Sequence, residues 1–126
     1  MIEGLFNQNN YVATKKMMDA TILRQEAIAS NIAHVETPGY QRMDVSEDFQ
    51  QQFAKALGDG NQHGMLQIKP KLEVDSTAVA QDVSGNTVDL ESEILNLSEN
   101  QIAHQLQSKI VTGTLKKLRL AITGRP

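Results

Sequence analysis

The sequence predicts a mainly α-helical fold with two long amphipathic helices near its ends, a short helix, and an irregular or weakly β middle segment. Apolar residues recur at helical spacing over residues 9–35 and again over 89–123, and only about fifty residues lie between these stretches. The 126 residues suit one domain. We therefore interpret residues 1–126 as a single unit in which the two terminal helices form a coiled-coil pair and residues 36–88 contain the turn, short helix and variable middle.

The first helix is expected over residues 9–35. One broad apolar arc contains Ala13, Met17, Ala20, Ile28, Ile32 and Val35. Arg24 and Gln25 interrupt the arc. Its width indicates more than one neighbour.

A turn ends this helix. Pro38 has no N–H to donate and biases Thr37 away from helical backbone angles, while Gly39 accepts a positive φ without steric strain. Asn31 is expected to bond a backbone carbonyl or a facing helix. The residues that define the turn motif are Ser30, Asn31, Ile32, Ala33, Thr37, Pro38, Gly39 and Tyr40.

A short helix is predicted after Ser46, which suits the N-cap position. Phe49 and Phe53 lie one turn apart on it, and Gly58 is placed to end it. Residues 58–64 read as a flexible connection. Residues 65–88 alternate weakly enough for a short strand or extended structure, or for a segment that becomes ordered only against a partner.

The second long helix is expected to run from Leu90 to about Thr123, with Asp89 as its cap and Gly124 as its stop. A helix of about 34 residues is roughly 50 Å long, whereas a compact domain of this size has a radius of gyration of about 14 Å. The helix should therefore extend beyond the rest of the chain. Gly113, in its interior, marks either a close helix approach or a weak point.

This helix carries two apolar stripes. The seam, with a coiled-coil spacing interrupted by Gln101, His104 and Ser108, consists of Leu90, Ile94, Leu97, Val111, Leu115, Leu118 and Ile122. The second face consists of Leu95, Ile102, Leu106 and Ile110. The N-terminal helix can cover one stripe, so covering both requires neighbouring molecules.

Several kinds of chemistry are not indicated. The sequence has no cysteine, its three histidines are far apart, and no phosphate-binding or nucleophile motif is present. We expect Glu91, Glu93 and Glu99 to be solvated. The sequence thus predicts no catalytic residues, no metal site, no cofactor and no small-molecule substrate.

The net charge and the hydropathy of the chain argue against further classes of function. A net charge of −3 gives no reason to expect nucleic-acid binding. The basic cluster Lys109, Lys116, Lys117, Arg119 and Arg125 is interpreted as a complement to the helix dipole. The apolar runs are too short to span a membrane, and residues 1–6 do not form a recognisable secretory signal.

The string from Ser30 to Tyr40 resembles the Ser-Asn-Ile-Ala-Asn-x-x-Thr-Pro-Gly-Tyr signature near the start of the axial proteins of the bacterial flagellum, with His34 in place of the usual Asn. Residues 85–93, Gly-Asn-Thr-Val-Asp-Leu-Glu-Ser-Glu, are similar to the entry into the C-terminal helix of short rod proteins. Residues 97–101 and 115–122 resemble the C-terminal helix of the proximal type of rod subunit. The related C type usually has an Arg-Ala-Tyr-Gln-Ala-Asn-like stretch, where this chain has Gln-Ile-Ala-His-Gln at 101–105.

The resemblance implies a structural subunit of the proximal rod of the flagellar basal body. Such a subunit assembles through its terminal helices into a drive shaft that crosses the periplasm and is required for motility. Its implied partners are copies of itself, other rod proteins, an adaptor at the membrane ring, and the type III apparatus that exports it from the cytoplasm without a cleaved signal peptide.

Phe49 and Phe53 also resemble the motif by which early export substrates engage the export gate, although two phenylalanines at this spacing are as commonly a packed helix face. Two alternatives to the proximal subunit remain. One is another short rod subunit, of the C type, and the other is a cytoplasmic helical adaptor that binds a partner helix.

Overall fold

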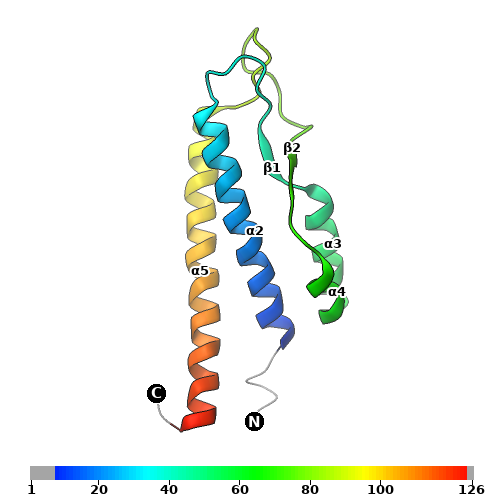
Figure 1. Cartoon of the computed structure of the whole chain (residues 1–126), viewed down its shortest axis with the longest axis vertical. Helices are drawn as coiled ribbons and strands as arrows, with labels where there is room; N and C mark the ends of the chain where they lie inside the picture. Colours follow the sequence, from blue (N-terminus) through cyan, green and yellow to red (C-terminus); the bar gives the residue numbers. More distant parts are fainter. Residues whose placement is uncertain (1–7, 125–126) are drawn as a thin grey trace.

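A computed structural model describes residues 8–124 of the chain, so the expectations for residues 1–6 and for Arg125 concern positions outside this range. In chain order the elements are α2 (Gln8–Ala33), β1 (Met43–Val45), α3 (Glu47–Gly58), α4 (Gln62–Gln67), β2 (Leu72–Val74) and α5 (Leu90–Thr123). The predicted fold class is confirmed: the chain is mainly helical, with a long helix towards each end and a small sheet in the middle (Figure 1).

The two long helices lie side by side and run in opposite directions. The end of α2 and the start of α5 meet at one end of the molecule, and β1, α3, α4 and β2 pack along the other side of α2 (Figure 1). At the opposite end the last turns of α5 continue past residue 8. The long C-terminal helix therefore does extend beyond the rest of the described chain.

The helix boundaries follow local chemistry. The Ser46 hydroxyl accepts a hydrogen bond from the Phe49 amide at 3.2 Å, so it caps α3 as predicted. Asp89 precedes α5, but its side chain does not cap the helix and instead accepts a 2.6 Å bond from the Ser92 hydroxyl. Gly124, with φ +67°, ends α5 in the left-handed conformation typical of helix C-termini.

The middle segment contains more structure than the sequence predicted. A helix, α4, begins inside the expected flexible connection, because the Asn61 side chain caps it through a 2.9 Å bond from the Gly64 amide and Met65 is fully buried. The strand β2 falls inside the segment predicted as extended. Its antiparallel partner β1, which pairs Met43 with Val74, was not predicted.

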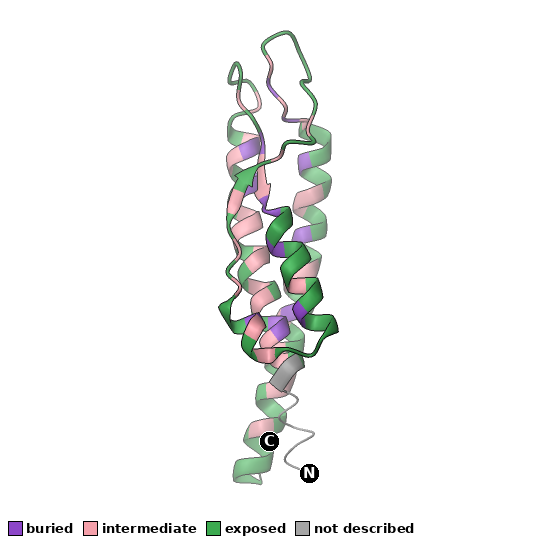
Figure 2. Ribbon diagram, turned by 90° about the vertical axis from the view of Figure 1, so that its right-hand side faces the viewer, coloured by how far each residue is buried: buried purple, intermediate pink, exposed green. Residues whose placement is uncertain are grey.

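The hydrophobic core lies between α2 and the α3–α4 pair. Ala13, Ala56 and Met65 form its buried centre, with Val12, Phe53, and Ile68 packed around them. In Figure 2 the buried residues are scattered along the inner faces of the helices, while much of α5 is exposed. The core therefore holds the middle segment against α2 but leaves α5 with little apolar cover.

Candidate assembly surface and the contacts that support it

The turn after α2 has the predicted form. The Thr37 amide donates to the His34 carbonyl at 3.0 Å, and the Tyr40 amide donates to the Thr37 carbonyl at 3.2 Å. Gly39 has φ +73°, a conformation that glycine adopts at little cost. This turn reverses the chain into β1.

Asn31 joins the end of α2 to the strand that follows. Its side chain is fully buried, its Nδ2 donates to the Met43 carbonyl at 2.9 Å, and its Oδ1 accepts from the Met43 amide at 2.9 Å. The predicted bond to a backbone carbonyl is confirmed. The partner is a residue of β1 and not a facing helix.

His34, which departs from the usual Asn of the signature, stacks on Tyr40. The ring centroids are 4.5 Å apart and the planes differ by 6°. Nδ1 of His34 lies 2.8 Å from the Ser30 carbonyl, and the Tyr40 hydroxyl donates to Oδ1 of Asn31 at 3.3 Å. The His34 ring therefore packs on the ring of Tyr40, whose hydroxyl bonds Asn31.

Asn86 holds this turn from the far side of the sequence. Its buried Nδ2 lies 2.9, 3.0 and 2.8 Å from the carbonyl oxygens of His34, Val35 and Thr37. Its Oδ1 accepts from the Val88 amide at 2.8 Å. The turn motif at residues 30–40 and the motif at residues 85–93 thus contact each other directly, which their separation in the sequence could not reveal.

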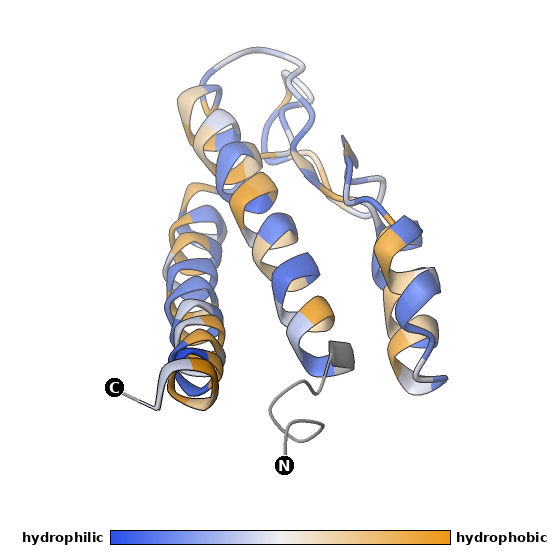
Figure 3. Cartoon of the chain, turned by 60° about the horizontal axis from the view of Figure 1, so that its bottom comes forward, coloured by the Kyte–Doolittle hydropathy of each residue, from blue (hydrophilic) through white to orange (hydrophobic). Residues whose placement is uncertain are grey.

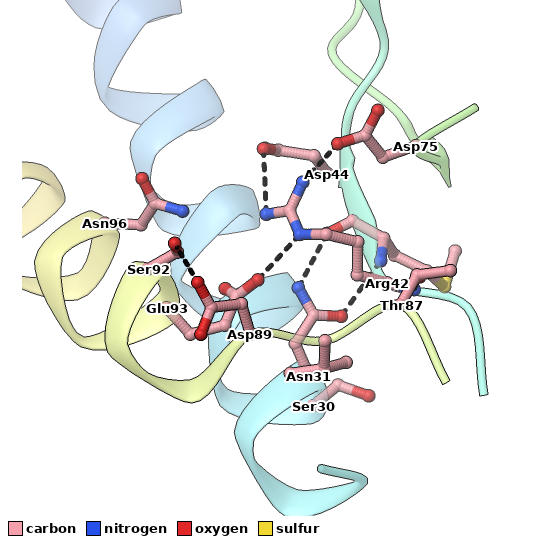
Figure 4. Close-up of polar contacts among 12 residues, drawn as sticks. Ser30, Asn31, Arg42, Asp44, Asp75, Thr87, Asp89, Ser92, Glu93 and Asn96 are labelled. Carbon is pink, nitrogen blue, oxygen red and sulfur yellow. Dashed lines mark hydrogen bonds and ion pairs between the residues drawn. The ribbon is translucent and has the colours of Figure 1, made fainter. Parts of the chain in front are cut away.

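An ion-pair cluster centred on Arg42 joins three segments (Figure 4). Nε of Arg42 lies 2.6 Å from Oε1 of Glu93, Nη1 lies 2.5 Å from Oδ2 of Asp75, and Nη2 lies 3.3 Å from Oδ2 of Asp44. Glu93 is only 1% exposed, so the expectation that it is solvated is wrong. The reason is that the chain immediately before β1 brings the cation Arg42 to this face of α5, which no local pattern indicated.

The charges in this cluster stabilise one another. Burial by itself would lower the pKa of Arg42, but the hydrogen bond and charge of Glu93, aided by Asp75 and Asp44, outweigh it and raise that pKa. Burial would likewise raise the pKa of Asp75, but hydrogen bonds from Thr77 and Arg42 outweigh it and lower that pKa. Both groups therefore stay charged near neutral pH.

Arg24 extends the cluster to α2. Its Nε lies 3.2 Å from Oδ1 of Asp44, and its Nη2 donates to Oδ1 of Asn96 at 3.4 Å. This explains why a cation interrupts the apolar arc of α2: it links that helix to both β1 and α5.

The interface between α2 and α5 is largely polar. Glu93, Asn100 and Gln107 are buried at a spacing of seven residues on α5. Nδ2 of Asn100 donates to the Thr21 carbonyl at 2.8 Å, and the Thr21 hydroxyl donates to Oε1 of Gln107 at 3.1 Å. This row of buried polar residues, and not the predicted seam, is the side of α5 that packs on α2.

The predicted seam is consequently left largely uncovered. Leu97, Val111 and Leu118 are half-buried, but Leu90, Ile94, Leu115 and Ile122 are 42–74% exposed. The expectation that the N-terminal helix covers one stripe is therefore wrong for the seam, because hydrogen bonding rotates α5 to present its polar row instead.

The second face is also open to solvent. Leu95, Ile102, Leu106 and Ile110 are 46–67% exposed, and hydrophobic residues recur along the whole of α5 (Figure 3). Monomeric proteins rarely expose apolar side chains in such continuous rows. The two faces of α5 are therefore the strongest candidate for an interaction surface in the described chain.

The charges on α5 are segregated along its length. Within α5, residues 90–108 contain three acidic residues and no lysine or arginine, whereas residues 109–123 contain four basic residues and no acid. The last turn of α5 contains no basic residue, and the dipole effect is limited to that turn. The dipole interpretation of the basic cluster is therefore wrong for most of its members.

Phe49 and Phe53 lie together on α3. Their rings stack with centroids 5.7 Å apart. Phe49 is buried and Phe53 packs against the core cluster. In the folded chain the pair is thus a packed helix face.

The described residues offer little for other kinds of site. Between residues 8 and 124 there is no group of three or more histidine, aspartate or glutamate side chains placed to hold a metal ion, and none of the helices there is long and apolar enough to cross a membrane. An open groove of about 470 Å³ runs beside the α2–α5 contact, lined by residues such as Ile22 and His104.

Comparison with known proteins gives a consistent result. No family model matches the chain. It is 29% identical over 123 residues to a protein of Borrelia hermsii, covering 85% of this chain and 90% of that protein. It is 30% identical to proteins of Yersinia ruckeri over 110 residues and of Escherichia coli strain K12 over 109 residues, in each case covering 74% of this chain and 78% of the relative. All three relatives are described as flagellar basal body rod protein FlgB.

Proposed function

This chain belongs to the family of flagellar basal body rod proteins named FlgB, and we propose that it is a structural subunit of the proximal rod, required for motility. The relatives are described as flagellar basal body rod proteins, a description that supports a structural role for this chain. In the proposed role the terminal helices pack against neighbouring subunits to build the drive shaft that crosses the periplasm. The turn motif and its supporting contacts set the angle at which the middle segment leaves the helices.

The observation that carries this proposal is the pair of exposed apolar faces on α5. Fully burying one leucine or isoleucine contributes about 1.5–3 kcal/mol. The seam and the second face together hold eight side chains that are more than 40% exposed, so neighbouring subunits could recover a large part of this energy. A subunit with two such faces suits a helical assembly, in which one molecule contacts several others.

The partners proposed for the chain are further copies of itself, other rod proteins and an adaptor at the membrane ring. Export through the type III apparatus, without a cleaved signal peptide, is part of the same proposal. Contact of Phe49 and Phe53 with the export gate would require α3 to unfold, because Phe49 is buried in the folded chain. This fits passage of an unfolded chain.

The proposal is tested by placing a charge on the seam. Leu115 is 47% exposed and makes no large contribution to the core, so Leu115→Glu should leave the chain folded. We expect this variant to be exported but to abolish rod assembly and motility, and Leu97→Glu to do the same. Leu115→Met is the matched control, and cells with this variant should keep both rod assembly and motility. Normal rods in cells whose only copy of the chain carries Leu115→Glu would refute the proposal that the seam is an assembly surface.

Two alternatives are separated by imaging basal bodies from a deletion strain. Loss of the whole rod, with a base that stops at the membrane ring, supports the proximal subunit. Loss restricted to a more distal part of the rod would favour the C type, although the relatives found are all described as FlgB. Intact rods would favour the cytoplasmic adaptor.

A further inference from the structure

The second face of α5 carries opposite charges at its two ends. Glu91 and Glu99 flank Leu95 near the start of the helix, and Lys109 and Lys117 flank Gly113 near its end. Each of these sets has members four residues apart, so its side chains lie on one side of a helix. All four charged residues are exposed, and none takes part in an ion pair within residues 8–124.

The two sets have the same spacing. Eighteen residues separate Glu91 from Lys109, Leu95 from Gly113, and Glu99 from Lys117. Eighteen residues correspond to five turns of an α-helix, or an axial distance of about 27 Å. The acidic and basic sets therefore occupy the same side of α5, displaced only along its axis.

We propose that a second copy of this chain packs its α5 parallel to the first, on the second face, with an axial shift of eighteen residues. This inference rests on the proposed function, because a polar rod repeats its subunits in one direction. The shift places Glu91 opposite Lys109 and Glu99 opposite Lys117. Leu95 then meets Gly113, where no side chain hinders close approach, and Ile102 meets Leu120.

Parallel alignments with shifts of zero, seven or eleven residues place the charged side chains against less favourable partners. With no shift, like charges face each other along the whole stripe. A shift of seven residues places Lys117 opposite Ile110, and a shift of eleven places it opposite Leu106. Burying an ammonium group against an aliphatic side chain without a partner is unfavourable. Among the parallel alignments the charges thus select one register, in which Leu95 and Ile102 of the second face supply the apolar contacts.

The opposite side of α5 is already occupied. Glu93, Asn100 and Gln107 pack on α2, and in Figure 1 no other element lies against the outer side of α5. Leu95, Ile102 and Leu120 are 64%, 67% and 48% exposed. A second copy can therefore reach this face without disturbing the fold of the first.

Charge reversal tests the pairing in cells. Glu91→Lys/Glu99→Lys and Lys109→Glu/Lys117→Glu should each reduce the amount of chain in purified basal bodies by about tenfold or more, since like charges then meet. A chain that carries all four substitutions should recover incorporation. Lys55→Glu/Arg119→Glu changes the net charge as much as the second variant, at exposed positions off the stripe, and should incorporate normally.

Cross-linking tests the direction and register. The chain has no cysteine, so copies with only Ile102→Cys or only Leu120→Cys can be mixed and oxidised in the assembled rod. The proposed register predicts an Ile102→Cys to Leu120→Cys disulfide. An antiparallel pair also matches the four charges, but it would instead link Ile102→Cys to Leu106→Cys and would overturn the proposal.

The outcomes separate this inference from the proposed function. If the wild-type chain is absent from basal bodies, the proposed function fails and the inference fails with it. If the wild-type chain is present and the reversed variants enter equally well, or if no disulfide forms between positions 102 and 120, only the inference fails. Circular dichroism of each purified variant checks that loss of incorporation is not loss of helix.

Discussion

Nε of Arg42 lies 2.6 Å from Oε1 of Glu93, and the glutamate side chain is 1% exposed. Arg42 immediately precedes β1 and Glu93 lies in the first turn of α5, so one contact joins segments that are 51 residues apart. The other carboxylate oxygen of Glu93 is buried and has no hydrogen-bond partner among residues 8–124. Arg42 is therefore the partner that holds the buried Glu93 side chain.

Removing one partner of this pair should strongly destabilise the fold. Glu93→Ala leaves the Arg42 guanidinium buried with less compensation, and breaking a buried pair typically costs about 3–5 kcal/mol. The midpoint of urea denaturation should fall accordingly. Glu91→Ala, on the exposed side of the same turn, is the control and should change the free energy of unfolding by less than about 0.5 kcal/mol. Equal effects of the two substitutions would contradict the assignment.

The stability of the fold should fall in acid because of Asp75. Its pKa is lowered in the folded state, chiefly by hydrogen bonds from Thr77 and the ion pair with Arg42 acting against burial. The stabilisation from this group is fully present above the unfolded pKa of about 4 and is lost as the pH falls through the folded pKa. Urea midpoints measured from pH 6 to pH 2.5 should show this loss, and Asp75→Asn should flatten the profile. An unchanged slope in that variant would rule out the contribution of Asp75.

Asn86→Ala should loosen the turn that follows α2. The substitution removes the donor that the carbonyls of His34, Val35 and Thr37 share, and the net contribution of a hydrogen bond is about 0.5–1.5 kcal/mol. Hydrogen exchange should increase for the amides of residues 34–40 before those of α2. Gln52→Ala, at an exposed position of α3, serves as the control. Unchanged exchange in the turn would show that Asn86 does not hold it.

Two glycine substitutions should have opposite effects. Gly39→Ala places a Cβ on a residue with φ +73° and should destabilise the chain by about 1–2 kcal/mol. Gly113 lies inside α5 with nothing within 4 Å of an added Cβ, so Gly113→Ala should stabilise the chain by up to about 1 kcal/mol. Thermal unfolding measures both changes in stability.

Gly113→Leu should keep the isolated chain stable yet hinder incorporation into rods, because the leucine would fill the proposed position of Leu95 of the neighbouring copy.

Local signals in the sequence were sufficient for most of the secondary structure. Ser46, Gly39 and Gly124 mark boundaries through backbone chemistry that depends on adjacent residues alone, and the structure has boundaries at all three. The strand β1 was missed because three residues give too short a pattern to detect. The helix α4 spans the end of the predicted flexible connection, 58–64, and the start of the segment predicted as extended, 65–88, because the glycines of the connection masked the cap that Asn61 provides.

The contacts between distant segments could not be predicted in the same way. Glu93 reads as an ordinary surface charge in its own neighbourhood, and its burial results from the contact with Arg42, which lies 51 residues away in the sequence. The side of α5 that packs on α2 could not be predicted for a related reason. Apolar periodicity identifies which residues of α5 are stabilised by burial. The hydrogen bonds of Thr21, Asn100 and Gln107 decide which side of α5 packs on α2.

The polar α2–α5 interface also has a calorimetric consequence. The heat capacity change of unfolding comes mainly from apolar surface that becomes hydrated, and on α5 much of that surface is already hydrated in the isolated chain. The folded subunit should therefore unfold with a small heat capacity change and a shallow stability curve. Association should then carry the large negative heat capacity change that most domains acquire on folding, so that warming through the physiological range strengthens the assembled state more than the subunit itself.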